Sequence, residues 1–366
     1  MKRRNFIGIA AASAVLAPLL SKGNGTSFIN DSLFKEDTSD INYVQIPQDL
    51  ELICPAPMKK GSVVAVTAPA SPTNLWEIHN GINFFKKMGC KIISGKSVNE
   101  RQYKYKYFSA SDEERAKEFM GFIQDKSVDC ILCARGGYGS MRILPLLDYE
   151  VIRQNPKIII GFSDITILIN SILKKSGVVT FHGAVASTYF QQQSVEIIKK
   201  LIFNNQKFTP VKITFPTVQT LASGVAEGQL VGGNLTMLIS SLGTPYEIDT
   251  QGKILLIEEV QEEPYKIDKM LSHLWLAGKL QEAAGIVVGY IKNIDSKRNF
   301  FPDYSFTIRE VFESRIKPLQ IPAIIGLPFG HFDNKLLLPL GIKAELNASL
   351  KTLTLLQPGT KSITNY

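Results

Sequence analysis

One serine lies where a nucleophile would be expected. Ser163 follows a run of three isoleucines (158–160) in Gly161-Phe162-Ser163-Asp164, and the next apolar residues recur at helical spacing. In such a strand-to-helix turn, backbone N–H groups at the helix N-terminus can stabilise an oxyanion. Helix capping by Ser163 or Asp164 is the commoner role, and the hydrolase pattern Gly-x-Ser-x-Gly is not met. The turn alone leaves both interpretations open.

A serine nucleophile needs a general base, and the base needs an orienting carboxylate. The chain has four histidines. His79 and His273 fall on predicted helices, where a structural role suits them. His182 follows a predicted strand and could face a cleft, whereas His331 follows a Pro-Phe-Gly loop sequence that suits the presentation of a side chain. We favour His331 as the base and keep His182 as the alternative.

Glu258 is the candidate carboxylate. It ends the apolar run 254–257, and an acidic residue at that point is poorly placed for solvent unless it faces a cleft. The alternative is that Glu258 and Glu259 begin a solvated loop and form an acidic surface with Glu262 and Glu263.

A glycine-rich turn, Arg135-Gly-Gly-Tyr-Gly139, follows another predicted strand. Glycines let the backbone approach a ligand and direct N–H groups toward it. The Gly-x-Gly-x-x-Gly spacing and the acidic residue of a dinucleotide site are missing. We expect an anion- or oxyanion-binding turn, with a plain glycine turn as the alternative.

Composition and charge exclude several classes of protein. The chain has 366 residues, 45% hydrophobic and 20% charged, which is typical of globular proteins. Of the net charge of +8, four charges come from Lys2, Arg3, Arg4 and Lys22, so the remainder carries +4. That charge is too small to indicate a nucleic-acid partner, and no DNA- or RNA-binding motif is present.

Residues 1–26 have the pattern of an export signal peptide. A basic start, Met1-Lys-Arg-Arg, precedes an apolar run at 7–20 and then small and polar residues. Arg3-Arg4-Asn5-Phe6-Ile7 also resembles a twin-arginine signal for the export of folded proteins. Because the apolar run is short for a membrane span, we expect a periplasmic protein without a stable span after signal removal. An uncleaved anchor and a cytoplasmic location are the less favoured alternatives.

The four cysteines are Cys54, Cys90, Cys130 and Cys133. The last two have metal-knuckle spacing, but no second Cys or His pair lies nearby to complete a tetrahedral site. Three residues apart on a predicted strand, their side chains point to opposite faces. We expect buried structural cysteines, no metal and no cofactor.

Two domains are expected. Strands and helices alternate along residues 58–200, which predicts a parallel α/β sheet that carries the serine. Residues 27–57 read as a linker into that domain. Residues 201–222 contain Pro210 and Pro216 and read as the interdomain connection. A second α/β domain at 223–366 carries Glu258 and His331.

Six ordered motifs together resemble a known family. They are Ala134 to Gly139, Gly161 to Thr166, His182-Gly183, Gly232 to Leu235 with Gly243 to Tyr246, Leu256 to Val260 with Pro264 to Asp268, and Gly330-His331 with Leu338 to Gly341. The chain resembles the LD-carboxypeptidase (muramoyltetrapeptide carboxypeptidase) family of serine peptidases from about residue 60 to about residue 355. The resemblance implies an N-terminal Rossmann-like parallel sheet with helices on both faces. It also implies a C-terminal α/β domain with a mixed sheet, and an active site between the two.

The resemblance implies a Ser-Glu-His triad, which maps onto Ser163, Glu258 and His331. Glu258 matches the first acidic position of the family's Leu-Glu-Asp motif, and Glu259 stands where the family usually has aspartate. The implied oxyanion hole consists of the backbone N–H groups of Gly137 and Asp164.

Three further residues are candidates for substrate binding. Arg135 could bind the terminal carboxylate of a substrate or serve as a structural hydrogen-bond donor. Tyr138 and Asn234, which lie in the matching motifs, are the other two.

The implied reaction removes the terminal D-alanine from the tetrapeptide stem of peptidoglycan, at its bond to an L-configured centre. The expected partners are a stem peptide or muropeptide and, in addition, a second copy of the chain in a homodimer. The family more often acts inside the cell, so the export signal is a departure. Two alternatives remain: a microcin-immunity-type hydrolase of peptidyl- or aminoacyl-nucleotides, and an exported peptide-binding protein without catalysis.

Overall fold

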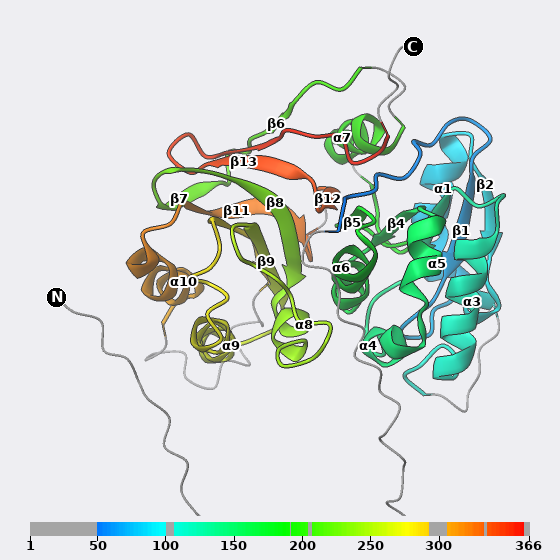
Figure 1. The fold of residues 1–366 in the computed structure, drawn as a ribbon, viewed down its shortest axis with the longest axis horizontal. Coiled ribbons are helices and arrows are strands. Elements are labelled where there is room, and N and C mark those ends of the chain that lie inside the picture. The colour runs from blue at the N-terminus through cyan, green and yellow to red at the C-terminus, as the bar shows by residue number, and fades with distance from the viewer. Residues whose placement is uncertain are drawn as a thin grey trace, which may run out of the picture. The chain divides into compact units, whose positions relative to one another are not determined.

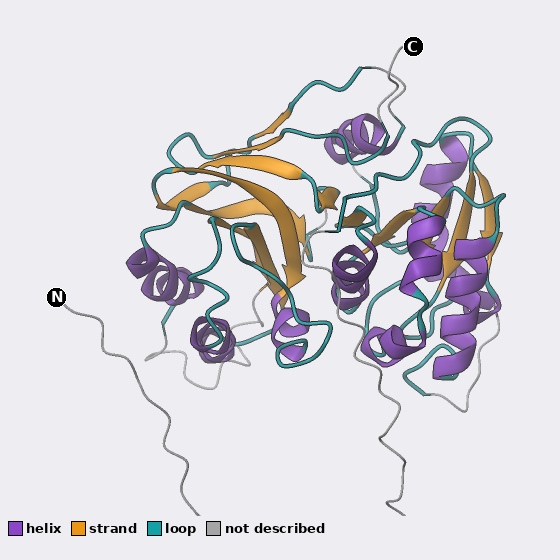
Figure 2. Cartoon of the chain, in the orientation of Figure 1, coloured by secondary structure: helices purple, strands orange, loops and turns teal. Residues whose placement is uncertain are grey.

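The computed structural model describes residues 50–99, 106–190, 192–203, 207–292, 306–332 and 335–361. All of them fall within one compact unit, Gln45–Tyr366. The described residues form a six-stranded and an eight-stranded sheet with helices packed against them (Figures 1 and 2). The predicted export signal and most of the predicted linker lie outside the described residues. Within the described part, no helix has the length and apolar character to cross a membrane.

The first sheet has the order β12-β5-β4-β3-β1-β2. Five of its strands are parallel: β1 (Val63–Thr67), β2 (Lys91–Ser94), β3 (Cys130–Cys133), β4 (Ile158–Gly161) and β5 (Thr180–His182). Every residue of β3 and β4 is buried, as expected for strands covered by helices on both faces. The helices of this part are α1 (Leu75–Lys87), α2 (Lys96–Asn99), α3 (Asp112–Gln124), α4 (Ser140–Ile143), α5 (Tyr149–Gln154), α6 (Ile165–Ser176) and α7 (Gln192–Ile202).

Local signals explain where these helices begin and end. Ser111 and Glu114 form a reciprocal capping box at the start of α3. Asn74 caps α1 by accepting a hydrogen bond from the Glu77 N–H. Gly177 caps the C-terminal end of α6, and its φ of 70° is left-handed and therefore favours glycine.

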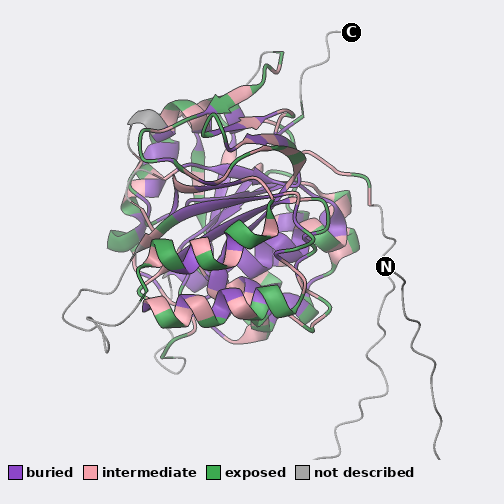
Figure 3. Cartoon of the chain, turned by 90° about the vertical axis from the view of Figure 1, so that its left-hand side faces the viewer, coloured by how far each residue is buried: buried purple, intermediate pink, exposed green. Residues whose placement is uncertain are grey.

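The second sheet has the order β6-β14-β13-β8-β9-β10-β11-β7. Its central strands are parallel: β8 (Val225–Asn234), β9 (Ile254–Val260), β10 (Gly285–Lys292) and β11 (Ala323–Gly330). Antiparallel strands flank them, so the sheet is mixed: β6 (Val211–Ile213), β7 (Gln219–Ala222), β13 (Lys343–Asn347) and β14 (Thr352–Leu355). Helices α8 (Leu235–Ser240), α9 (Pro264–Leu276) and α10 (Ile308–Ile316) lie together beside it (Figure 1). Figure 3 shows mostly buried strands behind helices whose outer sides are exposed.

The two sheets are tied together by pairings that the predicted domain boundaries do not anticipate. Strand β12 (Leu338–Leu340) comes from the C-terminal part but pairs with β5 in the first sheet. Strands β6 and β7 lie inside the predicted connection but belong to the second sheet. The buried Asn170 of α6 exchanges two hydrogen bonds with Gly232 of β8, at 2.9 and 3.0 Å. These contacts hold the ends of β4, β9 and β11 near one another.

Candidate active site

Ser163 occupies a strained turn between β4 and α6. Its φ is 63°, in the left-handed region that a residue with a side chain adopts only at a cost of about 1–3 kcal/mol. Asp164 is the residue that precedes α6, but its side chain makes no capping hydrogen bond to the helix. Capping by that side chain therefore does not explain this turn. A Cβ added at Gly136 would lie 2.9 Å from Ser163 Oγ, so only glycine fits beside the hydroxyl. The strain and this close approach fix the hydroxyl at the end of β4.

His331 joins Ser163 to Glu258. Its Nε2 lies 3.2 Å from Ser163 Oγ, and its Nδ1 lies 2.7 Å from Glu258 Oε2. His331 follows the end of β11 and is partly exposed, whereas Glu258, in β9, is fully buried. Burial alone would raise the pKa of Glu258, but the hydrogen bond and charge of His331 outweigh it and hold that pKa below its ordinary value. Glu258 is therefore an ionised carboxylate aimed at the imidazole.

Two backbone N–H groups beside Ser163 are available to an oxyanion. Among the described residues, neither the N–H of Gly137 nor that of Asp164 has a hydrogen-bond partner. Ser71 Oγ, which accepts a hydrogen bond of 3.0 Å from the Tyr138 N–H, holds the glycine-rich turn in place. The Asp164 carboxylate accepts a 2.8 Å bond from the Ser140 N–H, and burial raises the pKa of this carboxyl. The turn and the start of α6 are thus locked together.

A pocket of about 410 Å³ opens over the serine. Its lining includes Glu77, Arg135, Gly137, Ser163 and His331. Among the described lining residues Arg135 is the one arginine or lysine, and Lys335 lies close by, with Nζ 4.0 Å from the ring centroid of Phe162. Of the three residues predicted to bind substrate, Arg135 alone lines this pocket. The other two are placed differently.

Tyr138 and Asn234 have other surroundings. Tyr138 is about half exposed and stacks on Phe108, with ring centroids 5.6 Å apart. Asn234 is buried, caps α8 and donates a 3.0 Å hydrogen bond to Glu259. Neither is among the residues that line the pocket.

Comparison with known proteins decides the family. Residues 64–183 match the LD-carboxypeptidase N-terminal domain, and residues 227–346 match the LD-carboxypeptidase C-terminal domain. A Bacillus subtilis protein named "Probable murein peptide carboxypeptidase" is 39% identical over 303 residues, which cover 81% of this chain and 92% of the relative. The chain belongs to the LD-carboxypeptidase family.

Two further proteins are similar at lower sequence identity. The Microcin C7 self-immunity protein MccF of Escherichia coli is 28% identical over 333 residues, covering 82% of this chain and 94% of that protein. The crystal structure of a muramoyltetrapeptide carboxypeptidase from Oxalobacter formigenes superposes with a TM-score of 0.69 and 28% identity, over 80% of this chain and 98% of that one. The two-domain α/β architecture expected from the sequence is thus that of LD-carboxypeptidases.

A buried arginine supports the glycine-rich turn of this LD-carboxypeptidase, and sequence reasoning missed it. Arg115 of α3 is fully buried and donates hydrogen bonds to the backbone carbonyl oxygens of Gly139, at 2.8 Å, and Pro69. It also pairs with Asp112. The capping box at Ser111 predicts only where α3 begins. Nothing in the local sequence shows that Arg115 points inward.

His182, the alternative base, lies near the triad, with its ring edge-on to that of Phe162 and the centroids 6.3 Å apart, but it makes no hydrogen bond to Ser163. It is fully buried at the end of β5, and neither ring nitrogen has a hydrogen-bond partner among the described residues. Burial lowers the pKa of His182 to about 4, so the ring is neutral at ordinary pH. The contact with Ser163 is made by His331.

Neither a metal site nor a disulfide is found in the described part of the chain. Cys130 and Cys133 are completely buried, and burial raises the pKa of both thiols. The interpretation of these cysteines as structural agrees with that placement.

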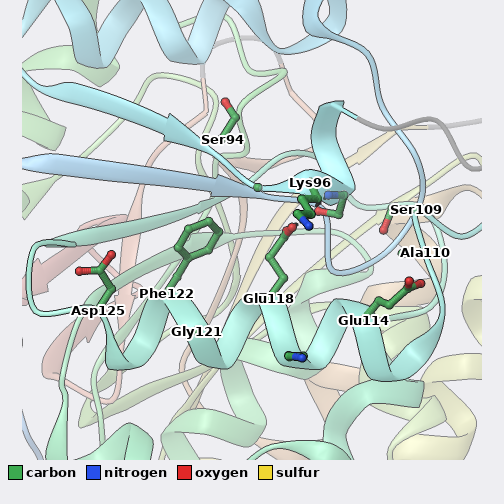
Figure 4. Close-up of a pocket in the computed structure, with 12 residues that line it drawn as sticks. Ser94, Lys96, Ser109, Ala110, Glu114, Glu118, Gly121, Phe122 and Asp125 are labelled. Carbon is green, nitrogen blue, oxygen red and sulfur yellow. Dashed lines mark hydrogen bonds between the residues drawn. The ribbon is translucent and has the colours of Figure 1, made fainter.

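A larger cavity of about 660 Å³ lies between the end of β2 and helix α3 (Figure 4). It contains none of the predicted site residues. Its central acid, Glu118, accepts hydrogen bonds of 2.6 Å from Thr67 and of 3.0 and 2.5 Å from the N–H and hydroxyl of Ser97. These hydrogen bonds give Glu118 a structural role, which is to tie α3 to β1 and to the start of α2.

Proposed function

We propose that this LD-carboxypeptidase removes the terminal D-alanine from peptidoglycan tetrapeptide stems with a Ser163-His331-Glu258 triad. The observation that carries the proposal is the hydrogen-bonded series from Ser163 Oγ through His331 to Glu258. Ser163 and His331 line the pocket, and Glu258 is buried behind them. Three such groups in series have no use in a protein that only binds peptides. Resemblance to murein peptide carboxypeptidases supports the substrate class.

In the proposed reaction His331 Nε2 takes the proton of Ser163 as Oγ attacks the carbonyl carbon that links the L-centre to D-alanine. The N–H groups of Gly137 and Asp164 donate hydrogen bonds to the resulting oxyanion. His331 then gives its proton to the leaving nitrogen, and D-alanine departs. Water, deprotonated by His331, then attacks the ester that remains on Ser163, and His331 returns this proton to Ser163 Oγ as the tripeptide acid leaves.

Glu258 keeps the imidazole in the reactive tautomer. With its carboxylate against Nδ1–H, the unprotonated Nε2 faces the serine hydroxyl. The same charge stabilises the imidazolium that forms during each proton transfer. Because Glu258 is buried, water does not screen this interaction.

We also propose that the reaction takes place in the periplasm. The basic start, apolar run and twin-arginine pattern of residues 1–26 support this location. A homodimer remains a prediction from the family resemblance.

Product analysis by mass spectrometry tests the proposed reaction. A disaccharide-tetrapeptide and the free tetrapeptide are incubated with the mature protein, with and without a chelator. We expect each substrate to lose one alanine at the same rate in both conditions, and Ser163→Ala to release none. Cleavage of an aminoacyl-nucleotide but of neither stem would instead place the chain with MccF-type hydrolases. Release of alanine by Ser163→Ala at the wild-type rate would remove Ser163 from the mechanism.

A further inference from the structure

The pocket over Ser163 holds two opposite charges that the proposed triad does not use. Arg135 Nη1 lies 3.2 Å from Glu77 Oε2, and both side chains are a little over two-fifths exposed. Both line the pocket that contains Ser163 and His331. An exposed ion pair of this kind stabilises the fold by less than about 1 kcal/mol, so stability gives little reason for its position.

Glu77 is held in place before any ligand arrives. Its Oε1 accepts a 2.6 Å hydrogen bond from the Asn74 side-chain amide, and its Oε2 accepts one of 3.3 Å from Thr73 Oγ1. The Glu77 N–H is bound in turn by the capping side chain of Asn74. The carboxylate is therefore fixed at the first turn of α1, with one side toward Arg135.

Arg135 keeps most of its donors free. Of the five N–H donors of a guanidinium, one is used by Glu77, and no other partner of the Arg135 guanidinium is found in the described part of the chain. A guanidinium with an open edge binds a carboxylate through two parallel hydrogen bonds. A lone carboxylate in that place would also face the negative charge of Glu77, whereas a group that carries an ammonium beside its carboxylate would satisfy both residues.

We propose that Glu77 and Arg135 bind the free amino-acid end of a diaminopimelate side chain, with Glu77 on its ammonium and Arg135 on its carboxylate. The inference rests on the proposed function, which places the L-centre of the third stem residue at Ser163. Four carbon–carbon bonds, about 5 Å in projection, separate that centre from the far end of diaminopimelate. A lysine stem offers an ammonium alone, and an amidated diaminopimelate offers no carboxylate. The pair thus selects stems with an unmodified diaminopimelate.

Substrate and enzyme variants together test the assignment. Four tetrapeptide stems are compared by kcat/KM: free diaminopimelate, its side-chain carboxamide, its side-chain N-acetyl derivative, and lysine. For the wild-type enzyme we expect the free form to exceed each of the other three by about 10–100-fold, the value of a charge-assisted hydrogen bond. In Glu77→Gln we expect the N-acetyl stem and the free stem to have equal kcat/KM. In Arg135→Gln we expect the carboxamide stem and the free stem to have equal kcat/KM. Glu196→Gln, which breaks the exposed Glu196–Lys199 pair, serves as the matched control and keeps the wild-type preferences.

The outcomes separate this inference from the proposed function. Equal kcat/KM values on all four stems, with alanine still released, would overturn the inference and leave the carboxypeptidase reaction standing. A fifth stem ending in D-alaninamide shows whether Arg135 binds the terminal carboxylate instead. If Arg135→Gln abolishes only the penalty for that amide, the diaminopimelate assignment is wrong. No cleavage of any stem would overturn the proposed function and the inference with it.

Discussion

Glu258→Gln is expected to lower kcat by about 10⁴-fold, as loss of the orienting carboxylate does in a serine triad. The glutamine side chain has nearly the same volume as that of glutamate, so the substitution leaves no cavity at this fully buried position. Its NH₂ group, however, can face His331 Nδ1 as a donor, which stabilises the tautomer with the proton on Nε2. In that tautomer His331 cannot accept the proton of Ser163, and the imidazolium loses its counter-charge.

The neighbouring acid provides the control. Glu259 is also buried in β9, but its carboxylate accepts hydrogen bonds from Thr236, at 2.7 Å, and Asn234 and does not contact His331. We expect Glu259→Gln to cost stability, because donors replace acceptors, and to change kcat by less than about tenfold. Steady-state kinetics and chemical unfolding of both variants measure the difference. Equal losses of kcat would mean that Glu258 has no special role toward His331.

Gly330→Ala is expected to lower kcat/KM by about 100-fold or more. Gly330 has φ 91°, and a Cβ there would lie 2.5 Å from Glu258 Oε2 and 2.6 Å from Glu258 Cβ. Either Glu258 or the backbone that carries His331 must therefore move. A displacement of about 1 Å in a catalytic group is enough for a loss of this size.

Gly61→Ala is a matched control for backbone strain. Gly61 has φ 90° and no atom within 4 Å of an added Cβ, and it lies before β1, at the other end of the strands from the site. Both substitutions cost about 1–2 kcal/mol of stability from the left-handed conformation. Kinetics and unfolding curves of the pair separate strain from displacement. If Gly330→Ala keeps the activity of Gly61→Ala, the packing of Glu258 against Gly330 is not what positions the acid.

The residues of the candidate site could be predicted where short-range patterns determine their position. Ser163 and Glu258 end or follow apolar strand sequences, and His331 follows a glycine at the end of another. The proximity of these three side chains could not be derived from those patterns, because it depends on the packing of two sheets. Only the order of six motifs, compared with a family, suggested it. The structure places His331 between the other two.

Arg115 and Glu77 could not be predicted for the same reason. The hydrogen bond from Arg115 to Gly139 spans 24 residues, and the contact between Glu77 and Arg135 spans 58. Both Glu77 and Arg115 lie near an ordinary helix start, where a charged side chain is usually solvated. Their roles arise only when the turn after β3 is packed against α1 and α3.

Strand pairing shows a similar limit. The alternation of strands and helices correctly predicted the five parallel strands of the first sheet, since each βαβ unit is local. The short strands β6 and β7 lie in a proline-containing stretch, which reads as a connection. They are strands because β14 and β11 offer free edges to them. Strand β12 likewise depends on β5, which is more than a hundred residues earlier.

Capture of the acyl-enzyme is the most direct test of the central claim that Ser163 is the nucleophile. The wild-type protein is mixed with a diaminopimelate tetrapeptide, quenched in acid within milliseconds to seconds, digested and analysed by mass spectrometry. We predict that the peptide containing Ser163 gains the mass of the stem tripeptide less water, and that this adduct is absent from Ser163→Ala. The Glu258→Gln variant should form it more slowly. An adduct on another residue, or alanine release by Ser163→Ala at the wild-type rate, would contradict the account.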